Sequence, residues 1–210
     1  MEGAAGGFVT WVLICLIVLS IVLASIFLFR PSATYDAAWK VMAFIGLCVL
    51  PALCIGMGMS TQMQRSEETR FCIACHEMAP FGQSLYVDDA KYIPAQHFQN
   101  HRVPADMACY ACHTDYTIFG PLKDKLQGIT RIYVQYLSTP PDPASIRVPG
   151  GYKNAQCLHC HLGARNFEEK PAHSAMMDSL KSNQKSCLTC HNMAHDVANL
   201  SHDKLWSPAQ

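Results

Sequence analysis

Two long apolar stretches occupy the first third of the chain, and no comparable stretch follows. Residues 8–29 form an uncharged run of 22, and residues 41–59 form an uncharged run of 19 that contains Pro51. A 22-residue helix is about 33 Å long, enough to cross the hydrocarbon core of a bilayer. Membrane helices tolerate proline and glycine. The pattern therefore predicts transmembrane helices at about 8–29 and 41–59, which form a membrane anchor over residues 1–62.

The first apolar run differs from a cleaved signal peptide. A signal peptide has a basic start and a shorter apolar core, whereas residues 1–7 contain no Lys or Arg. We expect a retained helix. The connection from Arg30 to Lys40 carries two cations and one acid, which indicates a cytoplasmic loop.

Residues 63–210 have the length of one domain. Strand signals are almost absent. Residues 122–136 and 171–183 are expected to be helical, and 63–71 to continue the second membrane helix. The predicted fold class is mainly α with long loops: two N-terminal transmembrane helices, then a compact domain.

Charge excludes one class of partner. The chain has 16 Lys+Arg and 16 Asp+Glu, a formal net charge of zero, so nothing indicates nucleic-acid binding. Three cysteines, Cys15, Cys48 and Cys54, lie in the apolar runs, where we expect small buried hydrophobic side chains.

The other eight cysteines form four Cys-x-x-Cys-His motifs, the attachment site of c-type haem. The motifs are Cys72-Ile-Ala-Cys75-His76, Cys109-Tyr-Ala-Cys112-His113, Cys157-Leu-His-Cys160-His161 and Cys187-Leu-Thr-Cys190-His191. Each cysteine pair would form thioethers with one porphyrin, and each following histidine would be an axial ligand. The sequence predicts four covalently bound haem c groups, which would supply most of the domain's core and be needed for folding.

Other readings of paired cysteines fit less well. Zinc sites and redox dithiols also use Cys-x-x-Cys, but neither requires a histidine after the second cysteine four times. A disulfide framework predicts irregular spacing. Because c-type haem is attached outside the cytoplasm, residues 60–210 are expected on the periplasmic side of a bacterial inner membrane.

Further axial ligands must come from outside the motif histidines. Histidine and methionine are both haem ligands, and the choice between them sets the potential. The candidates are Met78, His97, His101, His159, His173, His195 and His202.

The sequence resembles the NapC/NirT/NrfH family of membrane-anchored tetrahaem quinol dehydrogenases, over roughly residues 41–196. The resemblance rests on the segment Cys72-Ile-Ala-Cys-His-Glu-Met78 after an apolar helix, on His97-Phe-Gln-Asn, on Gly-Pro-x-x-x-Lys-Leu-Gln around Lys125, and on Cys-His-Asn-Met-Ala-His ending at His195. It implies that the first haem lies beside the membrane and takes electrons from menaquinol or ubiquinol.

The resemblance also implies roles for single residues. Met78 would ligate the first haem, and His97, His173 and His195 match distal ligands, with His101 one helical turn from His97 as its competitor.

Lys125 matches a lysine near the first haem and is a quinol-site candidate. Asp89, with Glu77 and Asp88, is a candidate acidic partner for quinol by its proximity to the first motif.

Three features depart from the family pattern. Tyr116 stands where many members have a histidine, so the distal ligand of the second haem stays open. No acid matches the family's downstream acidic residue within 128–135. The helix at 8–29 is additional, and it would either pack against another membrane subunit or serve as a second anchor.

The favoured hypothesis is a quinol dehydrogenase that draws on the quinone pool and delivers electrons to a periplasmic reductase or cytochrome. The alternative is a haem wire within a larger membrane complex, without its own quinol site. A terminal reductase is disfavoured, because no motif replaces its histidine with lysine.

Overall fold

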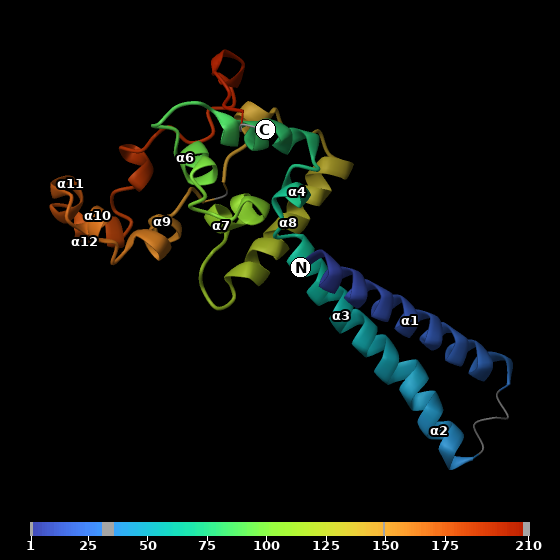
Figure 1. Cartoon of the computed structure of the whole chain (residues 1–210). Helices are drawn as coiled ribbons and strands as arrows, with labels where there is room; N and C mark the ends of the chain where they lie inside the picture. The colour runs from blue at the N-terminus through green and yellow to red at the C-terminus, as the bar shows by residue number, and fades with distance from the viewer. Residues whose placement is uncertain (1, 31–35, 149, 208–210) are drawn as a thin grey trace. The chain divides into compact units, whose positions relative to one another are not determined.

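A computed structural model describes residues 2–30, 36–148 and 150–207. It divides into two compact units, residues 1–66 and 67–210 (Figure 1). The described residues are mostly helical and form no strand, with one isolated antiparallel bridge between Val87 and Leu205. The predicted mainly α fold with two N-terminal apolar helices is confirmed.

The first unit is a helical hairpin. Its elements are α1 (Glu2–Phe29), α2 (Ala37–Phe44), the π-helix η2 (Ile45–Val49) and α3 (Leu50–Arg65). The two arms of the hairpin come into close contact at Gly46, whose carbonyl accepts a hydrogen bond from Ser20 Oγ at 3.2 Å. A Cβ at Gly46 would lie 2.9 Å from that of Leu23, so the close approach of α1 requires glycine there.

The π-helix has a physical cause in Pro51, which lies at the start of α3. Proline lacks an N–H, and its ring clashes with the carbonyl four residues earlier. A widened turn accommodates the ring without ending the helix. Because the helix continues through this turn, residues 37–65 form one long apolar stretch. This stretch and residues 7–29 are each long and apolar enough to cross a membrane.

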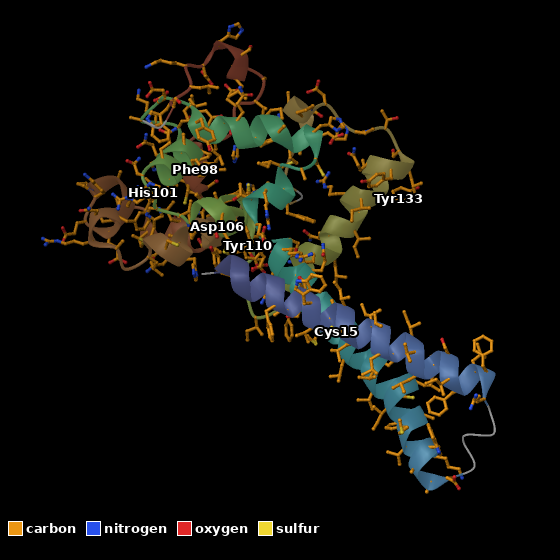
Figure 2. All side chains as sticks on the ribbon, turned by 45° about the vertical axis from the view of Figure 1, so that its right-hand side comes forward. Cys15, Phe98, His101, Asp106, Tyr110 and Tyr133 are labelled. Atoms are coloured by element: carbon orange, nitrogen blue, oxygen red, sulfur yellow. The ribbon has the colours of Figure 1, made fainter. Side chains whose placement is uncertain are left out.

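The three cysteines of this unit differ from expectation. Cys15 and Cys48 are exposed on the helix surface and Cys54 is half-buried, so the prediction of buried side chains is wrong (Cys15, Figure 2). A two-helix hairpin has too little interior to enclose them. Apolar side chains cover the same surface, as expected for helices that face lipid.

The second unit consists of short helices joined by loops. Its α-helices are α4 (Thr69–Cys72), α5 (Ala79–Gln83), α6 (Ile93–Gln99), α7 (Ala108–His113), α8 (Gly120–Leu137), α9 (Asn154–His161), α10 (Arg165–Glu168), α11 (Pro171–Ser174) and α12 (Met177–Lys181). The 3-10 turns are η3 (His76–Met78), η4 (Ser84–Tyr86), η5 (Ala105–Met107), η6 (Pro143–Ser145), η7 (Cys187–Thr189) and η8 (Leu200–His202).

Two expected helices are shorter than predicted. The helix expected to continue over 63–71 ends at Arg65, where Glu67 and Glu68 follow; carboxylates are unfavourable at the negative end of a helix. The helix expected over 171–183 is divided into α11 and α12.

Protein side chains alone form a small core in this unit. Val87, Tyr92, Ala95 and Leu200 make one buried cluster. The C-terminal segment closes over it through backbone hydrogen bonds, Asp88 N–H to Lys204 O at 2.8 Å among them.

Candidate haem sites

The four motifs occupy different local structures. The second lies in α7 and the third in α9, the first begins at the end of α4, and the fourth begins in η7. All eleven cysteines are free thiols. Within the described ranges, no group of three or more His, Cys, Asp or Glu side chains could hold a metal ion.

Three motif histidines face a second imidazole. Ring centroids are 6.1 Å apart for His113 and His195, and 6.0 Å apart for His161 and His97. His191 and His173 form the third pair, at 6.1 Å. Metal–nitrogen bonds to histidine are about 2 Å long, so two imidazoles on opposite sides of one metal ion have centroids about 6 Å apart. The separations fit one iron between the rings of each pair.

The non-motif histidine of two pairs is oriented by a backbone carbonyl. His97 Nδ1 lies 2.8 Å from Ile93 O, and His173 Nδ1 lies 2.9 Å from Phe167 O. A carbonyl only accepts, so each Nδ1 carries the proton and donates it. The Nε2 lone pair of both rings is then available to a metal, the usual arrangement for metal-binding histidine.

His195 uses a serine in the same way. Ser84 Oγ donates to Phe81 O at 2.6 Å and lies 2.7 Å from His195 Nδ1, so its lone pair can accept the Nδ1 proton. Burial lowers the pKa of His195 to about 4, which leaves its ring neutral at pH 7, the form that binds metals. Burial lowers the pKa of His113 as well.

The first motif differs from the other three. Among the described residues, no imidazole faces His76, whose side chain is 82% exposed. Met78 ends the 3-10 turn that starts at His76. The first motif therefore has a methionine sulfur two residues from its histidine, whereas each of the other motif histidines faces a second imidazole. Glu77 between them is buried, with Oε1 2.9 Å from His76 Nε2.

A threonine joins the first motif to the second. Thr69 Oγ1 donates to Ala105 O at 2.9 Å and accepts from Ala108 N–H at 2.8 Å, which holds α4 against α7. Cys72 and Cys109, which begin the first and second motifs, are therefore brought close together.

Two further side chains join the later motifs. Tyr152 Oη donates to the carbonyl of Cys112 at 2.6 Å, which ties the segment before the third motif to the second. Asn154, which is fully buried, accepts from Cys187 N–H at 2.9 Å and so ties the third motif to the fourth. Hydrogen bonds thus connect the four motifs in chain order.

Aromatic side chains also connect the third motif to the histidine pair of the fourth. Phe167 lies 5.7 Å from His161 and 4.4 Å from His173, centroid to centroid. A cavity of about 380 Å³ opens between α6 and the fourth motif, and His97, Cys190 and His191 are part of its lining. Ligand sites commonly have volumes of this order.

The quinol-site candidates lie in different settings. Lys125 Nζ lies 5.1 Å from the ring centroid of Tyr110, which is a residue of the second motif. Asp89 Oδ1 accepts from Lys91 N–H at 2.8 Å in a turn. Asp88 pairs with Lys204.

The remaining histidines lie apart from the pairs. His101 follows α6 with φ 52° and is exposed, as Figure 2 shows beside Phe98. His159 stacks on Tyr116 at 3.6 Å, and His202 is exposed in η8. Tyr116, at a position where many members of the resembling family carry a histidine, thus packs on the third motif.

Sequence reasoning did not identify the residues that connect and orient the sites: Thr69, Ser84, Tyr152 and Asn154. Their partners lie between 33 and 40 residues away for three of them, and 111 residues away for Ser84. No local pattern marks them.

Comparison with known proteins identifies sequence relatives of the chain. The model of the NapC/NirT cytochrome c family, N-terminal region, matches residues 34–146. Three sequences named cytochrome c-type protein NapC, from Escherichia coli strains K12, O6:H1 and O157:H7, are each 23% identical over 162 residues. The match covers 68% of this chain and 76% of each relative. No solved structure matches the chain.

Proposed function

The chain belongs to the NapC/NirT cytochrome c family of membrane-anchored electron-transfer proteins, and we propose that it oxidises quinol and delivers the electrons to a periplasmic redox partner. Members of this family bind haem c. We assign four haems to this chain, attached at the four cysteine pairs. The haem domain lies on the periplasmic face of a bacterial inner membrane.

The three imidazole pairs carry the electron-transfer part of the proposal. His113 with His195, His161 with His97, and His191 with His173 would each hold one iron from both sides. Haem iron with both axial positions filled exchanges single electrons without binding substrate. The hydrogen-bonded series of motifs keeps successive sites close, which a relay requires.

Met78, which in the family that the sequence resembles can replace the motif histidine, would hold the iron at the first motif, with His76 as the alternative ligand. This motif begins seven residues after α3 ends. A thioether ligand sets a different potential from a second imidazole. The first site therefore differs chemically from the other three, as suits an entry point for electrons.

Quinol oxidation also needs groups that bind the hydroxyls and accept protons. Each quinol releases two electrons, in single-electron steps, and two protons. Lys125 lies over the ring of Tyr110, a residue of the second motif, whose helix α7 is held against α4 and so against the first motif. It would bind a quinol oxygen and stabilise the negative charge left by deprotonation. Asp89 is the candidate proton acceptor.

The test is the reduction of the purified protein by a menaquinol or ubiquinol analogue, followed by haem absorbance. Lys125→Ala should slow reduction at least about tenfold, as expected for loss of a group that stabilises developing charge. Lys123→Ala, two residues away and paired with Asp115 at 3.7 Å, is the matched control and should reduce normally.

The haem-wire alternative predicts a different result. A chain without its own quinol site would not be reduced by any quinol, although dithionite would still reduce its haems. Such a result would overturn quinol oxidation and leave electron transfer within a larger complex.

A further inference from the structure

The longest helix of the haem unit, α8, carries an exposed apolar stripe. Six side chains form it, with exposed fractions between 50% and 79%: Leu122, Leu126, Ile129, Tyr133, Tyr136 and Leu137. At 100° per residue they lie within one arc of the helix surface. Figure 2 shows Tyr133 on the half of α8 that extends away from Tyr110. A stripe of this length on a water-soluble surface would be unfavourable.

The stripe does not face the second motif. Asp124 Oδ2 accepts from Asp115 N–H at 2.8 Å, and Lys125 lies over Tyr110, so these two residues fix the side of α8 that meets the second motif. The centre of the stripe is roughly a third of a turn away from that side.

We propose that α8 binds the membrane surface, with the stripe seated at the boundary between the lipid headgroups and the acyl chains. A membrane is the expected partner of the stripe, because the same chain contains two stretches, residues 7–29 and 37–65, that are apolar enough to cross a bilayer. They would hold the haem unit beside that bilayer. An amphipathic helix of this kind lies in the plane of the interface.

The composition of α8 fits a lipid surface. The helix contains three cations and one acid, and anionic headgroups attract cations. Lys123 and Arg131 are exposed outside the stripe, on the part of the helix that faces away from the acyl chains. Tyr133 and Tyr136 lie within the stripe, and tyrosine is enriched at the headgroup level of membranes.

Binding by α8 would limit the distance of the second motif from the membrane. His113 ends that motif seven residues before Gly120 begins the helix. Seven extended residues span at most roughly 25 Å. The amphipathic helix would thus keep the second motif, and Lys125 with it, close to the lipid phase in which quinol dissolves.

The test uses the full haem-loaded chain in nanodiscs that contain an anionic phospholipid. Cys15, Cys48 and Cys54 are replaced by alanine, so that an introduced cysteine is the free thiol measured. Leu126→Cys, Ile129→Cys and Tyr133→Cys report the stripe. Gln127→Cys and Arg131→Cys, exposed on the opposite side of the same helix, are the matched controls.

We expect a membrane-impermeant maleimide to label the stripe positions at least about tenfold more slowly than the controls, as for apolar faces buried in the interface. A photoreactive phospholipid should crosslink to the stripe and not to the controls. Equal labelling rates would overturn the proposal. Slow labelling without lipid crosslinks would also overturn it, because a protein or haem surface would then cover the stripe.

Discussion

The side-chain oxygen of Asn154 accepts a hydrogen bond from the backbone N–H of Cys187 at 2.9 Å, and this bond ties the third motif to the fourth. Asn154 Nδ2 also donates to the carbonyls of Leu180 and Lys185, at 2.8 and 2.7 Å. One buried side chain therefore satisfies three backbone groups around the last motif.

Replacing Asn154 by alanine should destabilise the protein by about 3 kcal/mol or more, since each buried backbone group left unpaired costs about 1–3 kcal/mol. Denaturant unfolding of the haem-loaded protein measures this. Asn199→Ala is the control: Asn199 is exposed and bonds Asp196 at 2.9 Å, so its loss should change stability by less than about 0.5 kcal/mol. Equal effects of the two substitutions would show that Asn154 does not connect the motifs.

Replacing His97 by alanine should convert one haem of the chain from low spin to high spin, because the iron opposite His161 loses its second imidazole. Magnetic circular dichroism counts the haems in each state. His101→Ala, the same substitution one helical turn away, should leave every haem unchanged. A spin change in the His101 variant alone would reverse the assignment.

Replacing Met78 by leucine should shift the potential of one haem, since the thioether ligand is lost while the side-chain volume is nearly preserved. A redox titration resolves the change. Met107→Leu, beside the second motif in η5, is the control and should leave all potentials as they are. Unchanged potentials in the Met78 variant would remove methionine from the first site.

Replacing Gly120 by alanine should displace the start of α8. An added Cβ would lie 1.7 Å from Asp115 O, a backbone atom, so the segment must move, at a cost of about 3 kcal/mol or more. Gly128→Ala is the opposite case in the same helix: no atom lies within 4 Å, and alanine should stabilise the helix by about 0.5–1 kcal/mol. Thermal unfolding of both variants checks the signs.

The sequence allowed the mainly α fold, the two apolar helices and the four motifs to be predicted because each rests on neighbouring residues. The end of α3 was misplaced, since Glu67 and Glu68 act on a helix terminus that hydropathy does not detect. The π-helix before Pro51 likewise results from a local clash and leaves no apolar periodicity to read.

The pairing of the histidines could not be read from spacing. His195 faces His113, 82 residues earlier, and His97 faces the third motif and not the nearer second one. The sequence left the distal ligand of the second haem open because Tyr116 replaces the usual histidine, and the ring that lies nearest to His113 in line with this role is that of His195, 6.1 Å away. Such pairings depend on how the chain returns through Ser84 and Asn154, whose hydrogen bonds span long sequence separations.

The haem content of the purified chain tests the account most directly. Pyridine haemochrome absorbance, combined with the intact mass of the denatured protein, counts the haems that remain covalently attached. We predict four haem c groups per chain, one for each Cys-x-x-Cys-His motif. A chain that carries no covalent haem, or zinc in its place, would contradict the account.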